Sequence, residues 1–180
     1  GPGQDGKTLQ PEGLPGSQLT DDQKTALTGL VSHYTGLLND DLAAARRDQR
    51  LAVALPVVRR MLIHPAAEAG MLAAIGNARG HLLWVEGDRG IRRLTSDMGF
   101  VAGANWSEQA VGTSAPGTAL TVGRSVQIHG AEHFNRLVAP WSCTAAPVHD
   151  PETRRVLGVI DVTGFGGRIK EYLVSVDLAK

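Results

Sequence analysis

The stretch that decides the fold reads Trp141-Ser-Cys-Thr-Ala-Ala-Pro-Val-His149, then Asp150-Pro-Glu-Thr-Arg-Arg155, then Val156-Leu-Gly-Val-Ile-Asp-Val-Thr-Gly164. Two mostly apolar runs flank a polar segment, and Asp-Pro is a strong turn signal. Apolar runs of this length, rich in β-branched residues, are typical of strands. The stretch therefore predicts an antiparallel hairpin of strands 141–149 and 156–163.

Strand alternation sorts the side chains of this hairpin into two faces. One face carries Leu157, Val159, Asp161 and Thr163, and one side of the partner strand carries Trp141, Cys143, Ala145, Pro147 and His149. A carboxylate inside an apolar strand needs a partner if it is buried. Asp161 is thus either a structural hydrogen-bonding group or the polar anchor of a ligand. An aromatic ring and a thiol on one side suit a small apolar ligand, and plain core packing is the alternative.

Upstream of the hairpin lies Gly112-Thr-Ser-Ala-Pro-Gly-Thr118, a segment of small residues. Such a loop lets backbone N–H groups approach a ligand, and Thr113 and Thr118 add hydroxyl groups. The segment lacks the lysine of a P-loop, so it does not support nucleotide phosphate binding. The alternative is a tight connection between two helices.

The sequence His129-Gly-Ala-Glu-His133 matches a zinc-peptidase pattern. That chemistry needs both histidines on one face of one helix. His129 is expected to end a strand and Gly130 to break the helical phase, which argues against a zinc hydrolase. His129, His133 and the neighbouring Phe134 are instead expected to line a pocket.

The rest of the chain is predicted mainly from apolar periodicity and from capping signals. A capping box at Thr20-Asp-Asp-Gln23 starts a helix whose stripe is Leu27, Leu30, Val31, Tyr34, Leu37, Leu38 and Leu42. Pro56 is expected to start a new helical turn rather than lie within a helix. Further helices are expected at 44–58, 65–75, 107–111, 116–123, 131–137 and 169–176, and further strands at 81–86, 91–95 and 125–129.

Composition restricts the class of protein. The 180 residues carry no net charge and have a pI of about 7.2, so there is no electrostatic footprint for nucleic acid or an anionic membrane. Cys143 is the only cysteine, so no intramolecular disulfide forms, and a cytoplasmic location is the simpler expectation. No apolar run approaches the length of a membrane span.

The element order predicts an α+β domain with about six mostly antiparallel strands flanked by helices. We interpret residues 1–18 as a tag remnant and flexible linker, 19–55 as an N-terminal helical extension, and 56–180 as the sensory domain described next. The helical extension either packs on the domain or makes it a homodimer.

Several blocks together resemble a GAF domain, and more closely the N-terminal sensory GAF domain of AcoR-type bacterial transcriptional regulators. The resemblance covers about residues 56–164, and 165–180 departs from the family pattern. It rests on Trp106-Ser-Glu, Val111-Gly-Thr-Ser-Ala-Pro-Gly-Thr-Ala-Leu120, Glu132-His-Phe134, Trp141 to Asp150 and Gly158 to Gly164.

The resemblance implies a six-stranded antiparallel sheet with helices on one face and a ligand cavity on the other. It also implies a DNA-binding or ATPase domain that follows elsewhere in the protein. We therefore expect a non-enzymatic, cytoplasmic sensor that binds a small-molecule effector between the sheet and residues 106–137. This segment itself is expected to contact neither nucleic acid nor membrane. The expected ligand contacts are Trp106, Thr113, Thr118, His129, His133, Phe134, Trp141, Cys143 and Asp161.

Besides the disfavoured zinc hydrolase, one other function stays open on the sequence alone. A haem or redox sensor would use His149 or His129 together with Cys143. The resemblance also brings in a methionine-sulfoxide-reducing branch of the family, which resolves its intermediate through paired cysteines, and the lone Cys143 cannot close that cycle. No cofactor is required by the sequence.

Overall fold

The computed structural model describes residues 16–27, 39–47 and 49–166 of a chain that divides into two units, Gly1–Tyr34 and Thr35–Lys180. In the first unit a helix over 21–27 follows the predicted capping box. The Thr20 backbone N–H donates to Gln23 Oε1 (2.9 Å), and the Gln23 N–H donates to Thr20 Oγ1 (3.3 Å). The capping box is therefore confirmed. Most of the predicted apolar stripe, at 30–38, and the predicted helix at 169–176 lie outside the described residues.

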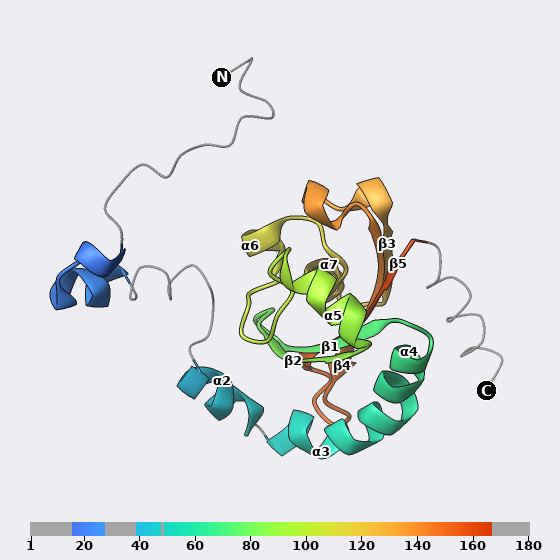
Figure 1. The fold of residues 1–180 in the computed structure, drawn as a ribbon. Coiled ribbons are helices and arrows are strands. Elements are labelled where there is room, and N and C mark those ends of the chain that lie inside the picture. Colours follow the sequence, from blue (N-terminus) through green and yellow to red (C-terminus); the bar gives the residue numbers. More distant parts are fainter. Residues whose placement is uncertain (1–15, 28–38, 48, 167–180) are drawn as a thin grey trace. The chain divides into compact units, whose positions relative to one another are not determined.

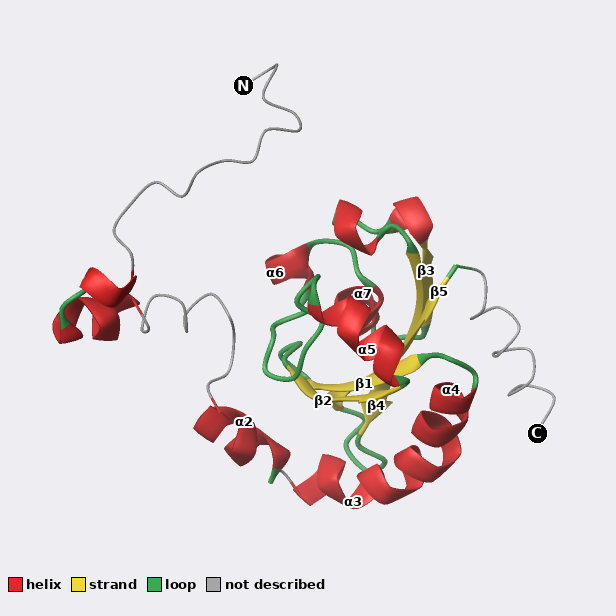
Figure 2. Cartoon of the chain, viewed as in Figure 1, coloured by secondary structure: helices red, strands yellow, loops and turns green. Residues whose placement is uncertain are grey.

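The second unit is built on one antiparallel sheet in the order β2-β1-β5-β4-β3 (Figures 1 and 2). The described residues form five strands where about six were predicted. The predicted hairpin is confirmed as β4 and β5, with Cys143 opposite Thr163 and Ala145 opposite Asp161. The strands are β1 Leu72–Asn77, β2 Leu82–Gly87, β3 Val126–His129, β4 Trp141–His149 and β5 Val156–Phe165.

Helices flank both faces of the sheet, rather than the single face that the family resemblance implied. Figure 1 shows α2, α3 and α4 on one side and α5 and α7 on the other. The first group is α2 Asn39–Arg46, α3 Gln49–Val58, the π-helix η2 Arg59–Ile63 and α4 His64–Glu68. The second group is α5 Arg89–Ser96, α6 Glu108–Val111, α7 Ala115–Val122 and the short 3-10 helices η3 Gly130–Glu132 and η4 Arg136–Val138.

The layer of α2, α3, η2 and α4 is attached to the sheet by apolar packing and by the hydrogen bonds of two arginines. Leu51, Leu55 and Ile63 pack in one cluster with Val162 of β5. Arg46 Nε donates to the Leu83 carbonyl (2.7 Å), and Arg59 forms a bidentate ion pair with Glu86 of β2. This layer closes one face of the sheet.

Pro56 lies inside α3, so the prediction that it starts a new turn is wrong. A proline within a helix removes one backbone hydrogen bond. The loss is tolerated because the helix is held by the packed side chains of Leu51 and Leu55, and tertiary packing supplies most of the stability of such helices.

The segment predicted as a helix to residue 75 is also different. The helix α4 ends at Glu68, Gly70 adopts a positive φ of 68°, and the chain continues as strand β1. β1 lies between β2 and β5 and is buried on both faces. A short apolar run without alternation does not distinguish a buried strand from a buried helix, which is why the sequence misled.

The predicted returning strand at 91–95 is helix α5 instead. Asp88 is its N-cap, and the Ile91 backbone N–H donates to Asp88 Oδ1 (2.8 Å). Gly87-Asp-Arg-Gly90 has the composition of a hairpin turn, and an aspartate in such a segment serves equally well as a helix N-cap. The single helix predicted at 131–137 is likewise replaced by η3 and η4.

The Asp88 cap gives a first testable prediction. Replacing Asp88 by alanine leaves the first turn of α5 without its acceptor and should lower the free energy of unfolding by about 1 kcal/mol. Ser107 is the matched control, because it occupies the N-cap of α6 without a side-chain capping bond. Urea unfolding of Asp88→Ala and Ser107→Ala should show a loss only for the first variant. Equal losses would contradict the assigned cap.

Candidate functional site

The candidate site lies on the face of the sheet that α7 covers, which we call the inner face. The strand register brings Cys143 beside Thr163 and Ile128, and Asp161 between Ala145 and Ala74. The alternation predicted for the hairpin is therefore observed for Val159, Asp161 and Thr163, whereas Leu157, beside the register irregularity at His149, packs with residues of the opposite face. The inner face consists of Leu72, Ala74, Val126, Ile128, Trp141, Cys143, Ala145, Val159, Asp161 and Thr163.

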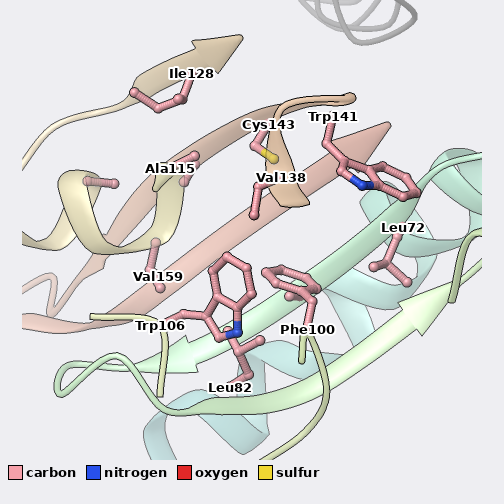
Figure 3. Packing of buried hydrophobic residues seen from close by; sticks show 13 residues of the cluster. Leu72, Leu82, Phe100, Trp106, Ala115, Ile128, Val138, Trp141, Cys143 and Val159 are labelled. Carbon is pink, nitrogen blue, oxygen red and sulfur yellow. The ribbon is translucent and has the colours of Figure 1, made fainter. Parts of the chain in front are cut away.

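Aromatic and small side chains close the inner face from the other side. Figure 3 shows the rings of Phe100 and Trp106 next to each other in this core. Their centroids are 4.7 Å apart in an edge-to-face arrangement, and Trp106 Nε1 donates to the Gly99 carbonyl (3.1 Å). Ala115 and Ala119 of α7 are fully buried against this cluster, so α7 approaches the sheet closely. Trp106 and Trp141, both predicted contacts, belong to one core.

Asp161 is the chemically unusual group of the inner face. It is fully buried, and the Thr163 hydroxyl donates to its Oδ2 at 2.6 Å. Its other carboxylate oxygen, Oδ1, has no hydrogen-bond partner among the described residues. Burial raises the pKa of Asp161 to about 7, and the hydrogen bond from Thr163 opposes that rise. The carboxyl group is therefore close to half-ionised at neutral pH, with one oxygen open to a further partner.

The thiol of Cys143 contacts the same Thr163 hydroxyl group. Its Sγ lies 3.4 Å from Thr163 Oγ1, and that hydroxyl has one proton, which serves the shorter contact to Asp161. The thiol is thus left as a donor to Oγ1. Burial raises the pKa of Cys143 well above its usual value, and the charge of Asp161 raises it further. The thiolate is strongly disfavoured, which makes Cys143 a poor nucleophile.

This environment predicts slow thiol chemistry. Native protein should react with Ellman's reagent more than about 100-fold more slowly than protein unfolded in urea, because the thiol is buried and protonated. The control is Ser125→Cys in a Cys143→Ala background, since Ser125 is exposed. A native Cys143 that reacts as fast as the Ser125→Cys thiol would contradict the assignment.

The small-residue segment forms the junction of α6 and α7. Gly117 packs directly on the α6 backbone, because a Cβ there would lie 2.6 Å from the Glu108 nitrogen. Thr118 Oγ1 is buried on α7 and has no partner among the described residues, and α7 packs on β4 and β5. Thr113 is half-buried, and its carbonyl accepts the Phe134 N–H (3.0 Å). Both interpretations of the segment keep support: it joins two helices, and it leaves a buried hydroxyl unpaired.

The two predicted histidines lie in different surroundings. His133 is buried, its Nδ1 is 3.0 Å from the Gly130 carbonyl, and its Nε2 has no partner among the described residues. Burial lowers the pKa of His133. His129 follows Ile128 and points to the opposite face of β3, where its Nε2 contacts Gln127 Oε1 at 3.4 Å. The structure does not bring His129 to the inner face.

The zinc-peptidase pattern does not form one helix. β3 ends at His129, and the next three residues form η3. Glu132 Oε2 accepts the His129 backbone N–H (2.7 Å) and so closes this turn. Within 16–27, 39–47 and 49–166, no group of three or more His, Cys, Asp or Glu side chains is placed to hold a metal ion.

Phe134 lies outside the inner face. Its side chain is 76% exposed, and its ring covers Gly112, where a Cβ would lie 2.6 Å from the ring. Phe100 and Thr163 also belong to the site and were not among the predicted contacts. Thr163 had a usable signal, because it shares its strand face with Asp161 two residues away. Phe100 had none, since it lies in a loop.

Comparisons with known proteins give one consistent family. The family model described as "MimR, N-terminal domain" matches residues 8–179. An uncharacterized 47.3 kDa protein in the thcA 5' region of Rhodococcus erythropolis is 44% identical over 171 residues, which cover 87% of this chain and 39% of that protein. The propane 2-monooxygenase operon transcriptional activator MimR of Mycolicibacterium smegmatis is 35% identical over 61% of this chain and 19% of its own. The acetoin dehydrogenase operon transcriptional activator AcoR of Bacillus subtilis is 38% identical over 63% of this chain and 18% of its own.

A solved structure supports the fold. The chain named in "Crystal Structure of the E.coli DhaR(N)-DhaL complex" superposes with a TM-score of 0.64 at 21% identity, over 72% of this chain and 45% of that one. The chain spans about two fifths or less of the length of the three sequence relatives named above. Among the helices that the structure describes, none is long and apolar enough to cross a membrane.

Proposed function

The chain belongs to the family of MimR N-terminal domains, and on this premise we propose that it is the effector-sensing domain of a bacterial transcriptional activator. Two relatives carry that activator role in their names, and they match this chain only in a fraction of their own length. DNA contact and the control of transcription then belong to other parts of the protein. The absence of net charge on this chain supports that division.

The proposed effector site lies between the inner face and residues 106–137. One observation carries it: Asp161 Oδ1 is fully buried and has no partner among the residues that the structure describes, although buried polar groups are nearly always paired. Leaving such an oxygen unpaired costs free energy, and a bound hydrogen-bond donor recovers that cost. Another buried atom without a partner among the described residues is Thr118 Oγ1, on the helix that covers the inner face.

The surroundings define the kind of effector. Trp106, Trp141 and Cys143 are apolar or weakly polar, so the body of the ligand is small and apolar. Its polar end is a hydrogen-bond donor directed at Asp161. The half-buried Thr113 and the buried His133 are then assigned to the margin of the site, whereas His129 and Phe134, which lie outside the inner face, are not part of it.

Binding would be transmitted by moving α7. Ala115 and Ala119 leave no space between α7 and the sheet, so a ligand on the inner face separates the two layers. The effector therefore selects a second packing of the same elements, which is a population shift. We propose that the terminal helices of a homodimer receive this change. The role is one of binding rather than catalysis, in the cytoplasm.

A thermal-shift screen of small organic compounds tests this proposal. Compounds that raise the Tm of the wild type should lose their effect in Asp161→Asn, which retains the size of the side chain but removes the ionisable acceptor. Glu152→Gln, at an exposed position, is the matched control and should respond as the wild type does. Compounds that stabilise all three proteins equally would overturn the assignment of Asp161 as the anchor.

A further inference from the structure

The outer side of α5 carries a second feature that the effector site does not use. Three exposed arginines surround a groove of about 460 Å³ beside β2 and the loop after α5. A groove of this volume falls in the range of small-molecule sites. Its lining is Val85, Arg89, Arg92, Arg93, Ser96, Phe100, Val101 and Ala102.

Arg89 occupies a position that is unfavourable for the helix itself. Arg89 is the first residue of α5, where the helix dipole favours acidic rather than basic side chains. Arg89 is also one turn from Arg92 and Arg93, and like charges at these spacings destabilise a helix. None of the three has a carboxylate partner among the described residues. Asp88, the acid next to Arg89, is occupied as the N-cap through Oδ1.

Opposite the arginines, the lining of the groove is apolar. Val85 and Val101 contribute carbon surface, Phe100 borders the groove with only 2% of its surface exposed, and the residues that line the groove include no carboxylate. Guanidinium groups bind phosphate and carboxylate through paired N–H donors. An anionic group facing the arginines would relieve their mutual repulsion, while an apolar group covers the aromatic and aliphatic side.

We propose that this groove is a second ligand site, for a small organic anion that joins a phosphate or carboxylate group to an apolar body. The site is separate from the effector site and does not depend on it. The two share a contact, however, because Phe100 lines the groove and its ring packs edge-to-face on Trp106. A ligand in the groove should therefore perturb the core around the inner face.

Trp106 also supplies the reporter for the test. Its indole N–H donates to the carbonyl of Gly99, the residue before Phe100, so its NMR resonance is sensitive to the groove. Phenyl phosphate is the probe, and phenol is its uncharged counterpart. Titration of phenyl phosphate should shift the Trp106 indole signal with a Kd of about 1 mM or tighter. Phenol should leave it unshifted, and the Trp84 signal, from the opposite face of the sheet, should move less.

Two triple variants make the test specific. Arg89→Gln/Arg92→Gln/Arg93→Gln should weaken phenyl phosphate binding at least about tenfold, and added salt should weaken binding to the wild type. Arg47→Gln/Arg124→Gln/Arg155→Gln removes the same charge from exposed positions outside the groove and should bind within about twofold of the wild type. Circular dichroism confirms that both fold, since all six side chains are exposed.

Three results would overturn the proposal. They are an unshifted Trp106 signal up to about 10 mM phenyl phosphate, equal losses in the two triple variants, or an equal response to phenol. Any of them would leave the effector site at Asp161 untouched, because the compounds and the variants used there are different.

Discussion

Asp161→Asn is expected to make the protein more stable than the wild type at pH 8. The pKa of Asp161 is about 7 in the folded protein, and its usual value is 3.8. At a pH between these two values, the native state therefore holds a proton that the unfolded state has lost. Stability therefore falls as the pH rises from about 4 to 7. A difference of about three pKa units corresponds to about 4 kcal/mol. Asparagine is neutral at every pH and still accepts a hydrogen bond from the Thr163 hydroxyl. The variant therefore does not lose stability as the pH rises.

Urea unfolding at pH 4.5 and pH 8 measures the effect. The wild type should lose several kcal/mol between the two values that Asp161→Asn does not lose, and the two proteins should be similar at the lower pH. Asp97→Asn, an exposed aspartate at the end of α5, serves as the control and should follow the wild type. Parallel pH profiles for Asp161→Asn and the wild type would show that this carboxyl group is not buried as described.

Trp106→Ala has the second large expected effect, a loss of about 3–5 kcal/mol in the free energy of unfolding. The indole is buried among Phe100, Leu82 and the inner-face residues, and its removal leaves a cavity at the centre of the core. Trp106→Phe retains an aromatic ring beside Phe100 and mainly removes the hydrogen bond to Gly99. That variant should lose about 1 kcal/mol for the bond and somewhat more for the smaller ring.

Chemical denaturation of both variants shows whether Trp106 is packed in a closed core or lines an open cavity. A large loss for alanine and a small one for phenylalanine would place Trp106 in a closed core in the absence of ligand. Small and equal losses would instead mean that the indole borders a space already filled with water. The comparison thus tests whether the effector site is closed before the ligand arrives, as the tight contact of α7 requires.

The hairpin and its two faces could be predicted because the information is local. Alternation of side chains along 141–149 and 156–163, with Asp-Pro between them, determines both the pairing and the side on which Cys143 and Asp161 lie. The capping box at Thr20 is local in the same way, since its two hydrogen bonds join residues three apart.

The central strand β1 and helix α5 could not be predicted on the same basis. β1 owes its conformation to β2 and β5, which are its neighbours only in the folded state. The cap at Asp88 competes with a turn of the same composition, and only the position of the Ile91 N–H decides between them. In both cases a tertiary or geometric fact overrides the sequence pattern.

The candidate site, too, could be predicted from the sequence only in part. The sequence identified Asp161 as a buried carboxylate that needs a partner, and the structure supplies Thr163 for one oxygen and no described partner for the other. It did not separate His129 from His133, because the turn after β3 sends the two rings to different surroundings. Which groups remain unpaired depends on the packing of α7 and η3, which spacing alone does not fix.

The most direct test of the effector site is a pH titration of the Asp161 side-chain carboxyl carbon by NMR, without and with a compound found in the thermal-shift screen. The free protein should titrate near pH 7. A bound donor on Oδ1 favours the charged form, so the compound should lower this pKa and shift the carbon signal at constant pH. A compound that binds to the protein yet leaves the Asp161 titration unchanged would contradict the assignment of Asp161 as the effector anchor.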